Sequence, residues 1–139
     1  MNLTIYHARD DGKGSALDIS YKVRGQNYED PAVFLKIVPQ TDTKQFNWHG
    51  GQTAMLNMQE VSQIIDYNPE KGEMKLMHMN SPKPKIVTLK LLSNGQRKTL
   101  YLNIYNNADK TNIGISLNKN EWGLIKKYLN SALHHIFIS

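Results

Sequence analysis

Residues 56–67 read Leu-Asn-Met-Gln-Glu-Val-Ser-Gln-Ile-Ile-Asp-Tyr, and residues 117–128 read Leu-Asn-Lys-Asn-Glu-Trp-Gly-Leu-Ile-Lys-Lys-Tyr. Leu, Asn, Glu, Ile and Tyr recur at the same offsets, and such an internal repeat limits the possible architectures before any residue is given a role. Each copy is also a helix-start signal. The Asn can cap the first turn, and the Glu three residues later can reach back to the free N–H of the cap. We therefore predict one helix in each half of the chain.

The segments that precede each helix have the alternation of half-buried strands. In residues 17–24 every second residue is apolar, which places Tyr21 on the apolar face and Lys22 on the polar face. Residues 99–106 alternate in the same way, with Tyr101 and Tyr105 on the outward face. Pro39 is expected to end one strand, and Asn94-Gly95 predicts a hairpin. The remaining predicted strands are 3–6, 32–38, 52–56, 73–79, 86–92 and 113–117.

These elements predict an α+β fold in which each half contributes about four antiparallel strands and then one helix. The first helix should end near Tyr67, before Pro69. At 139 residues the chain is long enough for one core, whereas halves of about 65–70 residues would each be marginal alone. We expect a single domain, residues 1–139, made of two similar halves, 1–68 and 69–139.

The charge balance favours an anionic partner. The formal net charge is +5 and the isoelectric point is about 9.4, which suits nucleic acid first and a membrane surface second, although many proteins are mildly basic. The absence of cysteine excludes disulfides and thiolate chemistry. No apolar run reaches membrane-spanning length. Met1 leads directly into a strand, so we expect no leader peptide. We expect a cytoplasmic protein if the source is prokaryotic or viral, and an organellar one if it is a trimmed eukaryotic protein.

Catalytic and metal-binding patterns are weak. The five histidines show no His-x-x-x-His spacing, and we expect them to be surface or helix-terminal residues. Glu60 and Glu121 already have capping roles. The segment Gly12-Lys13-Gly14 lacks a phosphate-binding pattern and predicts a hairpin turn. We therefore expect no enzymatic activity, metal, cofactor or small-molecule substrate.

Outward aromatic and basic residues are the better candidates for a site. Unstacked bases can lie on exposed rings while phosphates meet Lys and Arg. A charged outer face is also normal for a half-buried sheet, so a nucleic-acid site and a merely solvated face remain equal alternatives on this pattern. The candidate nucleic-acid-binding residues are Lys13, Tyr21, Lys22, Arg24, Lys36, Lys44, Phe46, Lys85, Lys90, Lys98, Tyr101 and Tyr105.

Several segments, taken in order, resemble the plant Whirly proteins. They are the apolar strand that ends at Pro39, the step Phe46-Asn47-Trp48, and the helix start Leu56-Asn57-x-x-Glu60. Residues 4–6 with 12–17 are similar to the family's first hairpin and its Lys-Gly-Lys-Ala-Ala-Leu motif, and residues 132–136 to its C-terminal Leu-Pro-His segment. The departures are Lys13 as the only lysine in the hairpin motif, and Asn47 in place of Asp.

The resemblance implies two four-stranded antiparallel sheets packed crosswise, with a helix after each. It also implies a homotetramer assembled through the helices, and single-stranded DNA bound along sheet edges with little sequence preference, in replication, recombination or repair. Kinetoplastid mitochondrial guide-RNA-binding proteins share this architecture, so RNA binding or annealing is an alternative. An oligomeric interaction module that binds no nucleic acid is another. The resemblance favours a structural role for Trp48, and the apolar stripe of the second helix, from Trp122 to Ile136, independently suggests helix-mediated tetramers.

Overall fold

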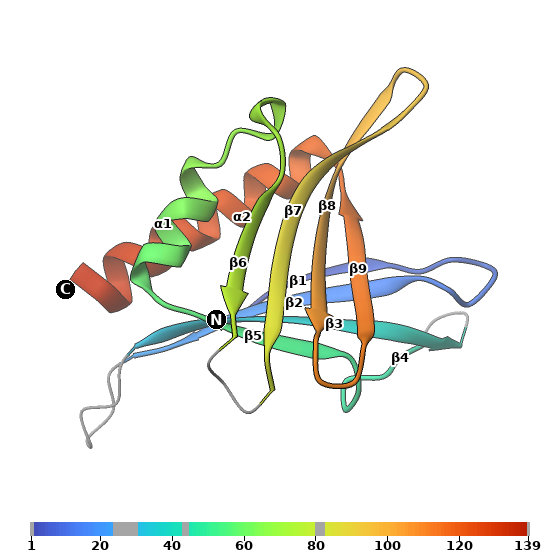
Figure 1. Cartoon of the computed structure of the whole chain (residues 1–139), viewed down its shortest axis with the longest axis horizontal. Coiled ribbons are helices and arrows are strands. Elements are labelled where there is room, and N and C mark those ends of the chain that lie inside the picture. The colour runs from blue at the N-terminus through green and yellow to red at the C-terminus, as the bar shows by residue number, and fades with distance from the viewer. Residues whose placement is uncertain (1, 24–30, 43–44, 80–82, 139) are drawn as a thin grey trace.

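The computed structural model describes residues 2–23, 31–42, 45–79 and 83–138 (Figure 1). All strand pairs are antiparallel. The first sheet contains β1 (Leu3–His7), β2 (Ser15–Lys22), β3 (Ala32–Asp42), β4 (Gln45–Phe46) and β5 (Gln52–Leu56), and the second contains β6 (Met74–His78), β7 (Lys85–Asn94), β8 (Arg97–Asn106) and β9 (Thr111–Leu117). The helices are α1 (Met58–Asp66), the short 3-10 helix η1 (Pro69–Lys71), α2 (Lys119–Ala132) and the π-helical η2 (Leu133–Ile138).

The predicted α+β architecture is confirmed. Each sheet is followed by one long helix, and the strands of the second sheet run across those of the first, with α1 and α2 lying together beside the sheets (Figure 1). The second sheet has the order β6-β7-β8-β9. The first sheet differs from the prediction because it has five strands, the short β4 and the longer β5 both pairing with β3.

Pro39 does not end its strand as predicted. β3 continues to Asp42 because the proline lies where the strand changes partner, between β5, whose pairing ends at Ile37, and β4, whose pairing begins at Gln40. The missing N–H of a proline is tolerated at such a junction. The Pro39 carbonyl still accepts a hydrogen bond from the Asn47 N–H at 2.9 Å. In the predicted second hairpin, Gly95 and Gln96 form the turn, with Gly95 at φ +64°.

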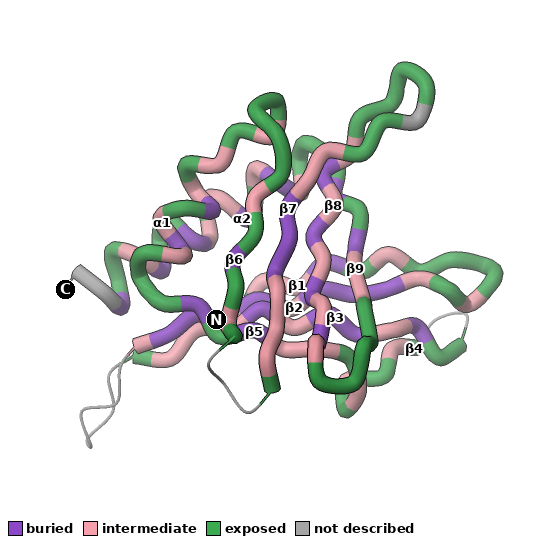
Figure 2. The backbone as a smooth tube through the Cα atoms, viewed as in Figure 1, coloured by how far each residue is buried: buried purple, intermediate pink, exposed green. Residues whose placement is uncertain are grey.

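The core lies between the two crossed sheets and the helices, and both halves contribute to it (Figure 2). Alternation places apolar residues on the inner face of every long strand, as predicted. The apolar stripe of α2 is buried as well, and it continues into η2. The buried members are Trp122, Ile125, Leu129, Ala132 and Ile136, and the predicted stripe residue Leu133 is half-buried against the same core. The helix therefore buries its stripe within one chain, and the stripe gives no reason for a tetramer.

Both predicted capping boxes are present, and the glutamate of each also contacts a histidine. His7 and His78, expected to be surface or helix-terminal residues, are instead part-buried at strand ends. Glu60 Oε1 accepts a hydrogen bond from the Asn57 N–H at 3.1 Å, and Glu60 Oε2 lies 2.5 Å from His78 Nε2. In the second copy, Glu121 Oε1 accepts from the Asn118 N–H at 2.9 Å, and Glu121 Oε2 lies 2.6 Å from His7 Nε2. One carboxylate therefore serves both the cap and a distant strand.

The two histidine contacts exchange partners between the halves. His7 is the last residue of β1, the first strand of the first half, and it meets the helix of the second half. His78 is the last residue of β6, the first strand of the second half, and it meets the helix of the first half. The internal repeat therefore extends beyond the helix starts to the ends of these strands.

The shared carboxylate generates a prediction about stability. Glu60→Gln keeps an oxygen for the cap, since Gln also serves in capping boxes, but it removes the charge that faces His78. We expect the free energy of unfolding to fall by about 1 kcal/mol, as for a charge-assisted hydrogen bond that is partly buried. Urea denaturation near neutral pH measures it.

The matched control is Glu73→Gln, which removes an exposed carboxylate 3.6 Å from Lys75 Nζ. A surface ion pair of this kind contributes little, so this variant should stay within about 0.5 kcal/mol of the parent. A double-mutant cycle of Glu60→Gln with His78→Ala should give a coupling energy clearly above zero. Strict additivity of the two changes would contradict the proposed link.

Candidate nucleic-acid interface

The outer face of the first sheet carries two of the predicted lysines. Lys22 Nζ lies 6.0 Å from the centre of the Phe34 ring, within the range of a cation–π contact. Lys36 Nζ donates a hydrogen bond to the Trp48 carbonyl oxygen and thereby ties the loop after β4 to β3. Lys36 also lies opposite Asp18 in the strand register. The Lys36 ammonium is therefore already engaged in an intramolecular hydrogen bond.

Three aromatic rings meet on the same outer face. The centre of the Tyr6 ring lies 5.4 Å from that of Phe46 and 6.0 Å from that of Trp48, the latter edge-on. We call these three residues the aromatic cluster. Tyr6 is 59% exposed, and the cluster lines an open groove of about 630 Å³ together with Ala8 and Gln45. Exposed ring surface of this kind can stack on unpaired bases.

Sequence reasoning found this cluster only in part. It included Phe46 in the site, favoured a structural role for Trp48 and gave Tyr6 no role. The available signal was the alternation of residues 3–6, in which Tyr6 stands on the face opposite the buried Ile5. What the sequence could not show is that the register places Ala16 and Val38 beside Tyr6 across the sheet. Small and short side chains at these positions leave space for the Tyr6 ring to reach toward β4.

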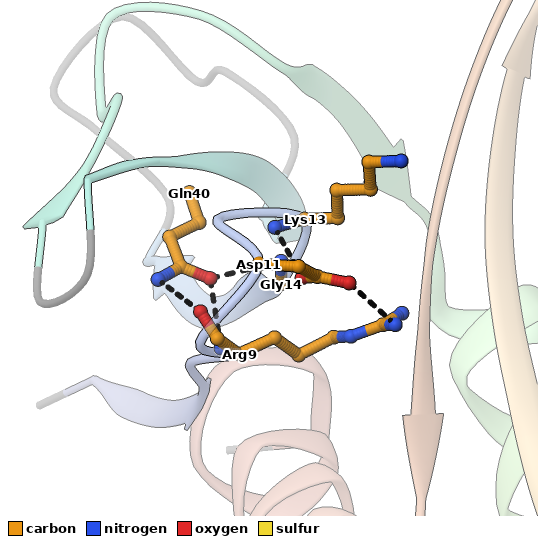
Figure 3. Close-up of polar contacts among 5 residues, drawn as sticks. All are labelled: Arg9, Asp11, Lys13, Gly14 and Gln40. Carbon is orange, nitrogen blue, oxygen red and sulfur yellow. Dashed lines mark hydrogen bonds and ion pairs between the residues drawn. The ribbon is translucent and has the colours of Figure 1, made fainter.

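The loop between β1 and β2 borders the cluster and presents Lys13. The side chain of Gln40, which is buried, holds this loop (Figure 3). Its Oε1 accepts hydrogen bonds from the Arg9 N–H at 2.8 Å and the Gly14 N–H at 2.9 Å. Its Nε2 donates to the carbonyl oxygens of Arg9 at 3.0 Å and Asp42 at 2.7 Å. All four hydrogen-bonding positions of the amide are thus used.

Asp11 fixes the tip of the same loop. Its carboxylate accepts hydrogen bonds from the Lys13 N–H at 2.9 Å and from Arg9 Nη2 at 2.7 Å. The Lys13 side chain extends away from these contacts and is exposed (Figure 3). Gly14 is required for a different reason, because a Cβ atom there would lie 2.0 Å from the His7 carbonyl oxygen.

The outer face of the second sheet carries the predicted tyrosines. Lys90 Nζ lies 5.9 Å from the centre of the Tyr101 ring. The Tyr101 ring lies against Gly114 of β9, where a Cβ would approach the Tyr101 hydroxyl oxygen to 2.3 Å. Tyr105 stands beside Ile86 in the register. Both tyrosines are half-buried, so each offers less free ring surface than Tyr6.

Three predicted residues lie apart from these surfaces. Tyr21 is on the inner face of β2, where its ring centre lies 6.0 Å from that of Tyr128 and 5.8 Å from that of His135. Lys85 Nζ donates to the Thr53 carbonyl oxygen at 2.6 Å and links the two sheets. Lys98 Nζ lies 3.8 Å from a carboxylate oxygen of Glu70, near the second hairpin. Arg24 and Lys44 lie outside the described residues.

Burial shifts the pKa values of Lys85 and of Tyr128, the neighbour of Tyr21. Desolvation, assisted by the charge of Lys83, lowers the pKa of Lys85, so the charged form of this lysine is less favoured than that of an exposed lysine. Desolvation also raises the pKa of Tyr128 to about 12, and the nearby Tyr21 and Asp18 add to the shift. Tyr21 therefore belongs to a packed internal aromatic pair, and its inclusion in the binding surface is not supported by its position.

Within the described parts of the chain, no group of three or more His, Cys, Asp or Glu side chains is arranged to hold a metal ion. No helix formed by the described residues is long and apolar enough to cross a membrane.

Comparison with solved structures shows a Whirly-like fold. WHY1 from Arabidopsis thaliana is 18% identical and superposes with a TM-score of 0.69, over 96% of this chain and 85% of that chain. The plant transcriptional regulator PBF-2 is 18% identical, with a TM-score of 0.71 over 97% and 89% of the two chains. The trypanosome MRP1/MRP2 structure is 14% identical, with a TM-score of 0.65 over 96% and 84%.

The sequence resemblance to the Whirly proteins is thus matched by the fold. No family model matches the sequence, and comparison with curated proteins finds no match. The likeness consequently concerns the architecture.

The close packing of Gly14 generates a prediction. Gly14→Ala places a methyl group against the His7 carbonyl and 2.5 Å from Gln40 Oε1, so we expect a loss of about 1–3 kcal/mol of folding stability, typical of overpacking. Gly123→Ala is the matched control, because a Cβ at this position in α2 meets no atom within 4 Å. It should be neutral or stabilise by up to about 1 kcal/mol. Equal urea midpoints for Gly14→Ala and Gly123→Ala would show that the packing around Gly14 does not exclude a Cβ atom.

Proposed function

We propose that this protein binds single-stranded nucleic acid with little sequence preference, and that it is a single-stranded DNA-binding protein that protects or organises strands in replication, recombination or repair. The observation that carries the proposal is the aromatic cluster, in which the Tyr6 ring is exposed and packs against the half-buried rings of Phe46 and Trp48. Rings exposed on a folded surface stack with any base, since every base has a π-face. A duplex hides those faces, so the proposal specifies unpaired bases.

The charge distribution also supports the proposal. Lys13 is exposed on the loop between β1 and β2, which contributes Ala8 to the groove of the aromatic cluster. We expect Lys13, and Lys90 on the second sheet, to meet phosphates, whereas Lys36 and Lys85 have internal hydrogen bonds. The net charge of +5 favours association with a polyanion. Base stacking together with a few phosphate contacts would give binding with little sequence preference.

RNA is the second candidate ligand. Ring stacking does not distinguish ribose from deoxyribose, and the fold is shared with the trypanosome MRP1/MRP2 structure, at a TM-score of 0.65. A protein that binds neither strand would fit the alternative of an oligomeric interaction module. The same titration with DNA and RNA oligonucleotides separates these outcomes.

We further propose a homotetramer, on grounds that differ from the buried α2 stripe. Leu124 stands on the side of α2 away from the core and is exposed. The resemblance to Whirly proteins implies assembly through the helices, and an exposed leucine suits such a contact. An assembled tetramer would bring several aromatic clusters within reach of one strand.

The proposed stacking predicts a specific pattern of affinity. In a fluorescence-anisotropy titration, single strands should compete with a labelled single strand far better than duplex of equal length. Tyr6→Ala should cost about 1–3 kcal/mol of binding free energy if a base stacks on the ring. It should leave the salt dependence unchanged, because no phosphate contact is lost. Folding stability should fall by about 1 kcal/mol, because the ring also packs against Phe46 and Trp48, so binding is compared at a temperature where both proteins are folded.

Lys13→Gln is expected to behave differently from Tyr6→Ala. Loss of one phosphate contact should flatten the log–log salt slope by about 0.7 and weaken all sequences alike. Lys71→Gln, an exposed change on η1, is the control and should alter neither quantity by more than a small general charge effect. Equal competition by duplex, or full affinity in Tyr6→Ala, would contradict the stacking mechanism.

The oligomeric state is tested separately. Light scattering of the full chain at micromolar concentration should give the mass of four copies, and Leu124→Glu should reduce it, because a carboxylate is costly to bury at an apolar contact. Lys127→Glu, an exposed charge change on the same helix, is the control for charge alone. A monomeric parent protein would remove the tetramer while leaving the stacking proposal open to its own test.

A further inference from the structure

Half of the methionines in the chain line one surface groove. The chain has six methionines, and Met55, Met77 and Met79 lie with exposed side chains on a groove of about 600 Å³. We call it the methionine groove. Its volume falls within the range of small-molecule and cofactor sites, about 300–1,000 Å³. Large apolar side chains gathered on an exposed surface mark a place where something binds.

The groove lies at the meeting of the two sheets. Met55 belongs to β5 at one edge of the first sheet, and Met77 belongs to β6 at one edge of the second. The floor includes Asn57, Glu60 and His78, which are the cap and its histidine link. These polar side chains already have partners: Asn57 Oδ1 accepts a hydrogen bond from the Glu60 backbone N–H at 2.9 Å, and Glu60 Oε2 lies 2.5 Å from His78 Nε2. The lining that remains available to a ligand is therefore mainly the exposed methionine side chains.

The internal repeat relates this groove to the aromatic cluster. His78 and His7 hold equivalent positions, since each ends the first strand of its half and meets a capping-box glutamate. The residue before each histidine points outward, and these residues are Met77, 60% exposed, and Tyr6, 59% exposed. The two halves thus present a thioether and a phenol at the same place on the same scaffold.

We propose that the methionine groove is a second base-binding site, which holds an unpaired nucleobase of the strand that the aromatic cluster binds. This inference rests on the proposed function. Thioether sulfur makes favourable contacts with aromatic rings, and the flexible side chain of methionine adapts to rings of different shape. That suits a site which accepts any base.

The surroundings favour nucleic acid over an uncharged apolar partner. Lys22 lines the groove, and its ammonium stands 6.0 Å from the Phe34 ring centre. Phe34 pairs with Met55 across β3 and β5. A base among the methionines would therefore have a cation beside it for its phosphate and an aromatic side chain next along the sheet.

Methionine oxidation provides a direct test. The full-length protein is treated with dilute hydrogen peroxide, free and saturated with a mixed-sequence single-stranded DNA oligonucleotide, and fragment mass spectrometry places each sulfoxide. Oxidation follows exposure of the sulfur. We expect saturation to slow oxidation of Met55, Met77 and Met79 by about fivefold or more, as covered sulfur is shielded. Met58, 45% exposed on α1 and outside the groove, is the internal control and should keep its rate.

Each outcome decides between distinct conclusions. Anisotropy that shows binding, with the three groove methionines oxidised as fast as in free protein, would overturn the groove while the proposed function stands. Protection of Met58 to the same degree would overturn it as well, because general shielding would explain both. Slow groove oxidation already in the free protein would assign the groove to a contact between copies. Absence of any oligonucleotide binding would overturn the proposed function first, and the groove with it.

A pair of variants gives an independent reading. Met77→Leu keeps an apolar side chain of similar volume and should bind within about twofold of the parent. Met77→Gln keeps the length but replaces the thioether by a polar amide, and it should lose affinity about fivefold or more. Because Met77 is exposed, both variants should fold with parental stability. Identical affinities of the two variants would overturn the proposal.

Discussion

In each half of the chain, one glutamate carboxylate makes two contacts on which the arrangement of the halves depends. Each capping-box glutamate satisfies a helix N–H with one oxygen and a histidine from the opposite half with the other. Because the exchange occurs twice, the helix of each half is fixed to the first strand of the other half. A shift of either half relative to the other would break these histidine–glutamate contacts. The outward residues Tyr6 and Met77 are consequently held at defined places on the surface.

Local rules were sufficient to predict most elements of the fold. The helix starts at Asn57 and Asn118 depend on residues three positions apart, and the strands depend on alternation, so both could be read from short segments. Features that depend on distant partners could not be read in that way. β3 passes through Pro39 because β4 and β5 meet there, and His7 pairs with a glutamate 114 residues away. The α2 stripe looked intermolecular because a single helix pattern does not say which surface covers it.

The candidate site was predicted less well for the same reason. Sequence alternation placed Lys22, Tyr101 and Tyr105 on outer faces, and the structure agrees. It could not show that the ammonium groups of Lys36 and Lys85 donate hydrogen bonds to backbone carbonyl oxygens. Nor could it show that Tyr6 reaches Phe46 and Trp48 across two intervening strands. Side-chain type and face are local properties, whereas availability for a ligand depends on the whole sheet.

The buried amide of Gln40 has a consequence for the thermodynamics of ligand capture. Since its four hydrogen bonds set the shape of the loop between β1 and β2, the conformational entropy of that loop is lost when the chain folds. Little of it remains to be lost when a strand arrives, and such preorganisation strengthens binding without adding any contact. The loop that carries Lys13 should therefore keep one conformation on binding. The entropy lost on binding is then mainly that of the flexible nucleic-acid strand.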